Sequence, residues 1–343
     1  MPISLNVLGM PQPDVTQLLN WIAAARPKFV LVMDNADLAT RVTMLGPTVI
    51  YRHWRSDDAA LHETTTPQQF LLSIAHYPAS WVIQALNEPQ GDQRTLAAWC
   101  AELIARADVQ GRRLALPNWS TGNPDPEAIA DGLYDPLWRA LAASGRHLLG
   151  VHEYAKESPA REPWHVGRYQ AILRRFDALG LKRPEIVVTE HGRDLGGGKG
   201  DGWKSVFTET EYAGFLAEAQ QVYSADGITA CVFSYGSGFG WDSFNVEGAT
   251  ELLRRMAAMN GDEAMVPGYR RATTKTPNTR VNLRAAPSIK AGVVAQISTG
   301  DYVKPLGNAV KADGYTWQLL ALDKDAASHV HGWAALEVLD IGG

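Results

Sequence analysis

Short apolar segments alternate with amphipathic stretches along residues 1–259 of the chain. Eight of these segments have the length of a strand, and a helical spacing of apolar residues follows most of them. The predicted strands are Ile3–Leu8, Phe29–Met33, Thr48–Trp54, Trp81–Leu86, Arg113–Pro117, His147–Val151, Glu185–Thr189 and Ile228–Ser234. The predicted helices are Asp14–Ala25, Ala36–Leu45, Pro67–His76, Thr95–Val109, Pro136–Ser144, His165–Leu179, Glu209–Ala225 and Ala249–Met259. Repeated strand–helix units of this kind indicate a parallel sheet.

Eight such units within residues 1–259 match the usual size of a (β/α)8 barrel. The structural alternative is a doubly wound open sheet, which usually has fewer strands. The Gly-rich dinucleotide turn of that fold does not follow the first predicted strand. We therefore predict an α/β protein whose main domain is a (β/α)8 TIM barrel.

The pattern of the sequence changes after Met259. Residues 260–278 are rich in Gly, Pro, Thr and charged residues, which indicates a linker or a tether along the surface. Beyond them, turn residues separate short alternating runs at Arg280–Arg284, Gly292–Ile297, Tyr302–Leu306, Thr316–Leu322 and Gly332–Leu339. We therefore predict a barrel domain over residues 1–259, a linker over 260–278, and a small all-β domain over 279–343.

The composition is that of a globular protein that can bury a core of normal size, with 45% hydrophobic and 20% charged residues. The formal net charge is −5, and no long run of Lys or Arg is present. Because nucleic acids and membrane surfaces require a basic patch, we expect neither as a partner. Cys100 and Cys231 each lie in an apolar stretch, which favours two buried free thiols over a disulfide. No cysteine spacing typical of a metal or redox site is present.

The N-terminal segment lacks a basic region followed by a continuous apolar run, so no secretory signal is visible. No apolar segment approaches the length of a membrane span. We expect a cytoplasmic protein, or one released by a route that this sequence does not reveal.

Active sites of (β/α)8 barrels lie at the C-terminal ends of the strands, so polar and aromatic residues there are the candidates. They are Asp34, Asn35, Arg52, His53, Trp54, Asn87, Glu88, Asn118, Trp119, His152, Glu153, Tyr154, Glu190, His191, Tyr235, Trp241 and Asp242. Among them, Glu88 and Glu190 follow the fourth and seventh predicted strands. Cleavage of a glycosidic bond needs such a pair, because one carboxylic acid protonates the leaving oxygen while the other carboxylate attacks the sugar or assists water.

Three motifs carry a resemblance to a known superfamily. The segments VIQALNEP (Val82–Pro89), HEY (His152–Tyr154) and IVVTEHG (Ile186–Gly192) follow one another on the fourth, sixth and seventh predicted strands. Together they resemble the motifs of clan A glycoside hydrolases, the "4/7" superfamily, over roughly residues 1–259. The resemblance implies a retaining enzyme that needs no metal or organic cofactor and acts on a carbohydrate.

The resemblance also implies roles for individual residues. Glu88 would be the acid/base and Glu190 the nucleophile that forms a covalent glycosyl-enzyme. Asn87 would bind the sugar 2-hydroxyl, Tyr154 would orient Glu190, and His152 would support the site. The superfamily's Arg near the nucleophile usually comes from strand two, whereas Arg52 belongs to the third predicted strand. The further substrate-binding candidates are His53, Trp54, Asn118, Trp119, Tyr235 and Trp241, with packing at the rim as the alternative for the tryptophans.

Two further expectations concern the catalytic end of the barrel. A negative Glu190 close to Glu88 would raise the pKa of Glu88 and keep it protonated as a general acid. Residues 194–203 contain five glycines but lack the Lys-Ser/Thr ending of a phosphate-binding loop. We predict that they form a mobile loop over a cleft, with Trp203 at its mouth.

The segment from Val281 to Gly307, together with Trp317 and HGWAALEVL (His331–Leu339), resembles bacterial SH3-like domains over about residues 279–341. Such modules often bind cell-wall peptide or glycan, and a structural appendage is the alternative. Three functions therefore remain open. They are a retaining β-glycosidase acting on a polysaccharide or oligosaccharide, an endolysin-like cell-wall lytic glycosidase directed by the SH3-like domain, and a non-catalytic carbohydrate-binding protein.

Overall fold

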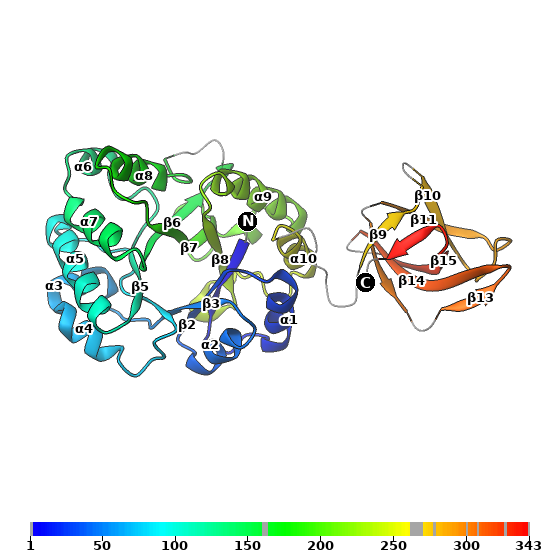
Figure 1. Cartoon of the computed structure of the whole chain (residues 1–343), viewed down its shortest axis with the longest axis horizontal. Coiled ribbons are helices and arrows are strands. Elements are labelled where there is room, and N and C mark those ends of the chain that lie inside the picture. The colour runs from blue at the N-terminus through cyan, green and yellow to red at the C-terminus, as the bar shows by residue number, and fades with distance from the viewer. Residues whose placement is uncertain are drawn as a thin grey trace. The chain divides into compact units, whose positions relative to one another are not determined.

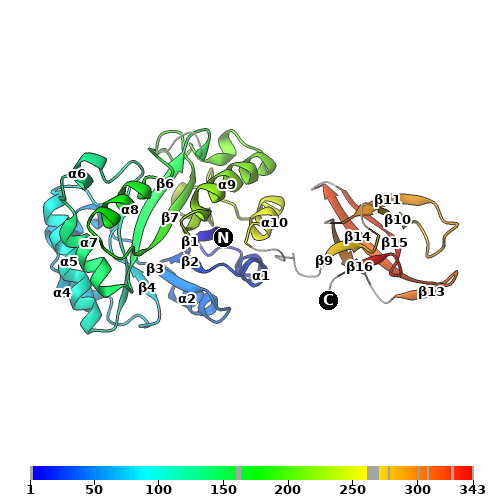
Figure 2. The same ribbon diagram turned by 45° about the horizontal axis from the view of Figure 1, so that its top comes forward.

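The computed structural model describes residues 3–159, 164–260, 270–276, 279–299, 301–306, 309–325 and 328–341. The chain divides into two compact units, residues 1–261 and residues 262–343. The first is a closed barrel of parallel strands in the order β1 to β8, with helices around the ring of strands (Figures 1 and 2). The predicted (β/α)8 barrel is confirmed.

All eight barrel strands coincide with predicted segments. They are β1 (Ile3–Leu8), β2 (Phe29–Met33), β3 (Thr48–Arg52), β4 (Val82–Gln84), β5 (Arg113–Trp119), β6 (Leu148–Ala155), β7 (Glu185–Arg193) and β8 (Thr229–Tyr235). β6 and β7 extend past the first polar residue at which the sequence pattern ends them. Their pairing continues after a register shift at Val151/His152, so that His152 lies opposite Glu190 and Tyr154 opposite Gly192.

The eight predicted helices are present as α1 (Val15–Ala25), α2 (Ala36–Thr43), α4 (Pro67–Ser73), α5 (Gln93–Val109), α7 (Asp135–Ser144), α8 (Tyr169–Ala178), α9 (Glu209–Ser224) and α10 (Thr250–Ala258). Local capping explains several starts. Thr66 and Thr208 each form a capping box with the residue three positions later, which satisfies backbone N–H groups of the first turn. Short helices that we did not predict are α3 (Leu61–Thr64) and α6 (Pro126–Ala130), together with 3-10 turns such as η1 (Asp58–Ala60).

One end of the barrel interior is filled by apolar side chains from seven strands. They are Phe29, Leu31, Ile50, Val82, Ala115, Leu148, Val187 and Cys231, and we call this set the apolar layer. Cys231 and Cys100 are both buried and free, as predicted. In the described part of the chain, no helix is long and apolar enough to cross a membrane.

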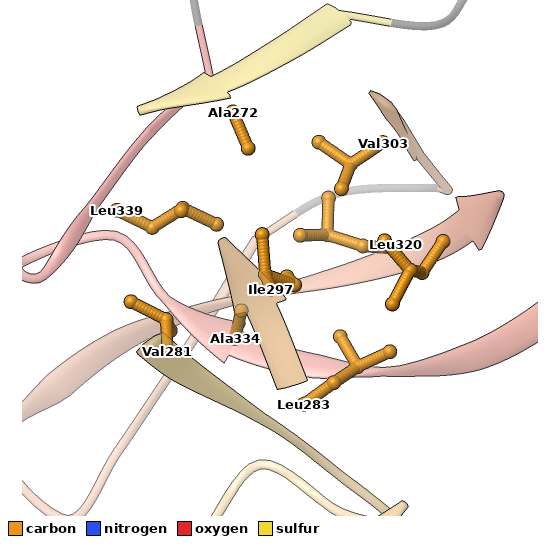
Figure 3. Packing of buried hydrophobic residues seen from close by; sticks show 9 residues of the cluster. Ala272, Val281, Leu283, Ile297, Val303, Leu320, Ala334 and Leu339 are labelled. Atoms are coloured by element: carbon orange, nitrogen blue, oxygen red, sulfur yellow. The ribbon is translucent and has the colours of Figure 1, made fainter. Parts of the chain in front are cut away.

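The second unit is an antiparallel β domain. Its strands are β9 (Arg270–Thr274), β10 (Arg280–Arg284), β11 (Val293–Ser298), β12 (Tyr302–Pro305), β13 (Val310–Ala312), β14 (Tyr315–Asp325), β15 (Ser328–Ala335) and β16 (Leu339–Ile341). They are ordered β11-β10-β15-β14-β12-β9-β16, with β13 paired to β14. Side chains from seven of these strands form its core (Figure 3). The likeness to SH3-like domains stays a prediction.

The linker predicted over 260–278 is wrong in its second half. β9 lies within that range and pairs with both β12 and β16. The side chain of Ala272 is fully buried in the core of the β domain. The run RRATT carries arginines and threonines whose pattern indicates a polar linker, but Ala272 and Thr274 are buried and both edges of the strand are paired.

Candidate active site

A cavity of about 440 Å³ opens at the C-terminal ends of the barrel strands, within the size range of small-ligand sites. Its lining residues come from β2, β3, β6, β7, β8 and the segments that follow β3, β4, β7 and β8. They are Met33, Arg52, Trp54, Asn87, Glu88, Tyr154, Glu190, Asp194, Gly197, Lys199, Phe233, Trp241 and Phe244. Seven of the twelve residues to which the sequence assigned catalytic or substrate-binding roles are among them. Asp194, Gly197 and Lys199 belong to the Gly-rich segment predicted to lie over a cleft, whereas Met33, Phe233 and Phe244 were not predicted.

Glu190 is held in place near the end of β7 by two donors. Nη1 of Arg52 lies 3.1 Å from its Oε1, and the hydroxyl of Tyr154 donates to its Oε2 at 3.0 Å. Only 11% of the Glu190 side chain is exposed. Burial and the adjacent Glu190 charge raise the pKa of Tyr154 well above its ordinary value, so the phenol stays protonated and remains a donor. The carboxylate of Glu190 is therefore fixed with its charge stabilised.

Glu88 follows β4 in a backbone conformation that few side chains adopt, with φ of 49°. Its N–H donates to the carbonyl of Asn118 at 2.9 Å, which ties the turn to β5. The side chain is 46% exposed, far more than that of Glu190. A left-handed conformation costs about 1 kcal/mol or more, and such strain is concentrated at functional sites. The turn directs one carboxyl group into the cavity.

His152 joins the two glutamates. Its Nδ1 lies 3.2 Å from Oε1 of Glu88 and 3.6 Å from Oε2 of Glu190. The two carboxylate oxygens are therefore no farther apart than the sum of these distances. That upper limit, 3.2 Å plus 3.6 Å or 6.8 Å, lies above the ~5–5.5 Å of retaining glycosidases and just inside the ~6.5–9.5 Å of inverting ones, so it is compatible with both.

The pKa of Glu88 departs from the expectation drawn from the sequence. The hydrogen bond from His152 lowers the pKa of Glu88 from its ordinary value, and the charges of His152 and Arg52 act in the same direction, while burial opposes them. The expected increase caused by Glu190 is therefore wrong for the site as it stands. The contacts of Glu88 with His152 and the charge of Arg52 outweigh the effect of burial.

Aromatic side chains form one wall of the cavity. Trp241 meets the rings of Phe233 and Phe244 edge to face, with centroids 5.3 Å and 5.4 Å apart. Trp54 contributes a half-exposed ring, and the backbone N–H of Trp54 donates to Oδ1 of Asp34 at 2.9 Å. The sequence pattern placed Phe233 inside a strand and missed its role. Period-two alternation from Cys231, which faces the barrel interior, is the signal that could have identified it.

The Gly-rich segment 194–203 lines the cavity with Asp194, Gly197 and Lys199. It is held to the loop after β8, because Ser243 accepts from Gly202 N at 3.0 Å and donates to the Lys199 carbonyl at 2.5 Å. Trp203 is buried and stacks on Tyr212 with centroids 4.9 Å apart, so its predicted place at the mouth is wrong. The segment is thus an anchored wall of the cavity.

Five of the twelve residues lie outside the cavity lining, namely His152, which contacts both glutamates, and four further candidates for substrate binding. Asn118 is fully buried and donates to the carbonyls of Leu86 and Ala115, so it braces β4 against β5. Trp119 packs edge-on against Tyr134, and the hydroxyl of Tyr235 donates to the carbonyl of Asp14. His53 is 59% exposed and pairs with Asp34. Strand alternation and the turn after β3 direct these four side chains away from the cavity, and their role in substrate binding stays a prediction.

Comparisons with known proteins bear on the fold. No family model matches the sequence, and no curated protein matches it. A trimodular GH5_4 subfamily endoglucanase aligns with 98% of this chain and 77% of its own, at 11% identity and a TM-score of 0.50. A β-mannanase from Thermomonospora fusca aligns over 75% and 91% at 17% identity and a TM-score of 0.45. The likeness to the endoglucanase shows that the two chains share a fold.

Proposed function

We propose that this chain is a retaining glycoside hydrolase that cleaves β-glycosidic bonds in a polysaccharide or oligosaccharide. Glu88 is the acid/base and Glu190 the nucleophile. The observation that carries the proposal is the pair of carboxyl groups that face one cavity and share contacts with a single nitrogen of His152. Retention requires the second carboxylate to lie near enough to attack the sugar without an intervening water, and the upper limit on the separation of the two carboxylate oxygens allows this.

In the first step, Glu190 attacks the anomeric carbon while the bond from that carbon to the leaving oxygen breaks. Glu88 gives its proton to the leaving oxygen. Arg52 and Tyr154 hold Glu190 in one orientation, so little rotational freedom is lost when the covalent bond forms. Partial exposure of Glu88 fits its role, because the leaving group departs toward solvent.

In the second step, a water molecule adds to the anomeric carbon and the ester bond to Glu190 breaks. Glu88 takes the proton of that water. A sugar in the cavity removes water from Glu88, and desolvation raises the pKa of a carboxyl group, which favours the acid form needed for the first step. Once Glu190 is a neutral ester, its charge no longer opposes ionisation of Glu88, which favours the base form.

Side chains around the two glutamates suit a sugar ring. The amide of Gln84 donates to Oδ1 of Asn87 at 2.9 Å, which leaves the Asn87 amide group oriented to donate to a sugar hydroxyl. The rings of Trp54 and Trp241 offer apolar faces on which sugars stack. The cell-wall lytic alternative stays a prediction, because no described feature of the β domain identifies its ligand.

Product stereochemistry tests the mechanism. The full chain is incubated with β-glucan, mannan and xylan oligosaccharides, and proton NMR of fresh products reports the anomer. Retention predicts the β-anomer first, followed by mutarotation. An initial α-anomer would contradict the double-displacement mechanism, and no hydrolysis of any β-glycoside would contradict the proposed activity.

Chemical rescue tests the assignment of the two glutamates. In Glu88→Ala, an activated aryl glycoside still forms the covalent intermediate because its leaving group needs no proton, and azide then yields the β-glycosyl azide. In Glu190→Ala, azide takes the place of the nucleophile and yields the α-glycosyl azide. The α-azide from Glu88→Ala together with the β-azide from Glu190→Ala would show that the two roles are exchanged.

A further inference from the structure

A buried carboxylate outside the cavity contacts the same arginine that holds Glu190. Nη2 of Arg52 lies 3.4 Å from Oδ2 of Asp58, while Nη1 of Arg52 faces Glu190. Asp58 begins the short turn η1 after β3 and is not among the residues that line the cavity. Its side chain is 12% exposed. One guanidinium group is therefore shared between two carboxylates, of which Glu190 lines the cavity and Asp58 does not.

The surroundings of Arg52 show why this sharing matters. The Nε of Arg52 is buried and has no hydrogen-bond partner among the described residues, so Glu190 and Asp58 are its two ion-pair partners there. Burial raises the pKa of Asp58, and the charges of Arg52 and Arg55 oppose that effect. Other titratable groups that face this arrangement are Glu88, whose pKa the charge of Arg52 lowers, and His152 and Tyr154 on β6.

We propose that Asp58 is a positioning residue that tunes the nucleophile through Arg52, by taking up part of the arginine's positive charge. The inference rests on the proposed function of Glu190. If Arg52 faced Glu190 alone, its full charge would act on that carboxylate. The carboxylate would then hold its electrons more tightly and be a weaker nucleophile. Asp58 leaves Glu190 oriented by Arg52 but less completely neutralised.

Charge tuning and simple tethering predict opposite shifts in the pH dependence. Asp58→Asn keeps the size of the side chain but removes its charge. Under charge tuning, the acid limb of the profile of kcat/KM against pH moves to lower pH by roughly half a unit to one unit, because Arg52 then favours the ionised nucleophile more strongly. If Asp58 only held Arg52 in place, its loss would weaken the contact of Arg52 with Glu190, and the limb would move to higher pH.

Asp57→Asn is the matched control. Asp57 is the neighbouring residue, carries the same charge, and pairs with Arg55 at 3.0 Å on a more exposed side of the turn. We expect about a tenfold fall in kcat with little change in KM for Asp58→Asn, and an unchanged profile for Asp57→Asn. Asp58→Ser is the second uncharged variant, so the result does not depend on the folding of one protein. An acid limb that stays in place or moves to higher pH in both Asp58 variants overturns the proposal.

A readout without substrate separates this inference from the proposed activity. Carbon-13 labelling of glutamate side chains gives a carboxyl signal for Glu190, assigned by its loss in Glu190→Gln. The pH at which this signal moves should be lower in Asp58→Asn than in the unmodified chain and in Asp57→Asn. If the chain hydrolyses glycosides but this signal is unaffected by Asp58→Asn, the tuning role fails alone. If the signal shifts as expected but no glycoside is hydrolysed, the proposed function fails alone.

Discussion

The two ends of the barrel interior are built from the same strands but by opposite chemistry. β3 contributes Ile50 to the apolar layer and Arg52 to the cavity, β6 contributes Leu148 and Tyr154, and β7 contributes Val187 and Glu190. At the apolar end, stability comes from removing hydrocarbon from water. The other end carries the cavity, and we call it the catalytic end after the proposed function. There Arg52 and Glu190 are largely removed from water, and their ion pair and hydrogen bonds offset the cost of that desolvation. On each of these strands, a residue of the apolar layer and a residue of the cavity therefore lie only a few positions apart.

Backbone conformations with a positive φ also occur at the catalytic end of the barrel strands. Three residues other than glycine have a positive φ within a barrel strand or in the turn after one, namely Asp34 (54°) after β2, Glu88 (49°) after β4, and Asn118 (59°) in β5. All three lie toward the catalytic end. Buried hydrogen bonds hold this geometry, such as the contact from Thr189 to Oδ1 of Asn118 at 3.1 Å. The catalytic end is therefore the place where stability is given up to aim particular side chains.

The largest expected effect is the loss of activity when the charge at one end of β7 is removed. Glu190→Gln should lower kcat on the order of 10⁴-fold, because the amide is too weak a nucleophile to displace the leaving group. Glu185→Gln is the matched control, since Glu185 begins the same strand and pairs with Lys28 and Arg113. We expect the control to keep its activity within about twofold and to lose less than about 1 kcal/mol of stability. Comparable activity of both variants would remove the distinction between the two ends.

The second prediction concerns a residue of β6 whose replacement should lower stability and leave activity unchanged. Leu148→Ala should lower the free energy of unfolding by about 2–5 kcal/mol, because it leaves a cavity in a layer whose neighbours are fully buried. Activity of the folded fraction should be unchanged, since Tyr154 lies six residues farther along the strand, about 20 Å away. Urea unfolding followed by tryptophan fluorescence, together with kcat at 25 °C, measures the two quantities. A fall in kcat parallel to the fall in stability would mean that the two ends are coupled.

The sequence predicts the apolar end better than the catalytic end, and for a physical reason. Apolar runs such as Phe29–Met33 coincide with their strands, because burial on both faces of a barrel strand leaves a continuous hydrophobic signal. The same signal stops early on β7, which continues to Arg193, since strand pairing extends past Thr189 into polar residues. Strand boundaries at the catalytic end follow from hydrogen bonding between chain segments that are distant in sequence.

Candidate site residues divide in a similar way. Glu88, Glu190 and Tyr154 line the cavity because motif order and strand position place them there together. Asn118 and Tyr235 were chosen for the same position at a strand end, but their side chains are buried and brace the backbone. Asp58 gave no signal of its own, since its importance depends on the turn η1 bringing it to Arg52. The direction in which a side chain points after a strand depends on the geometry of the turn, which cannot be read from a single sequence.

The smallest expected effect concerns Glu153, whose neighbours are His152, which contacts both glutamates, and Tyr154, which lines the cavity. Glu153 is fully buried and accepts hydrogen bonds from Gly167 N at 2.7 Å and Tyr169 N at 3.1 Å, at the start of α8. Burial raises the pKa of Glu153 to about 7 from its ordinary value of 4.5. Below pH 4.5 the group is protonated in both the folded and unfolded chains. As the pH rises from 4.5 to 7, the unfolded chain releases its proton first, so the folded state loses stability relative to it.

This shift corresponds to up to about 3 kcal/mol, which Glu153→Gln removes because its amide does not titrate. We therefore expect the stability of the unmodified chain relative to Glu153→Gln to fall between pH 4.5 and pH 7 and then to level off. Urea unfolding at half-unit pH steps measures the difference, and Glu102→Gln on the exposed surface of α5 controls for loss of charge alone. A difference that stays flat for Glu153→Gln would mean that hydrogen bonds from α8 stabilise the carboxylate as well as water does. In that case burial of the Glu153 carboxylate would lower the stability of the fold far less than its raised pKa implies.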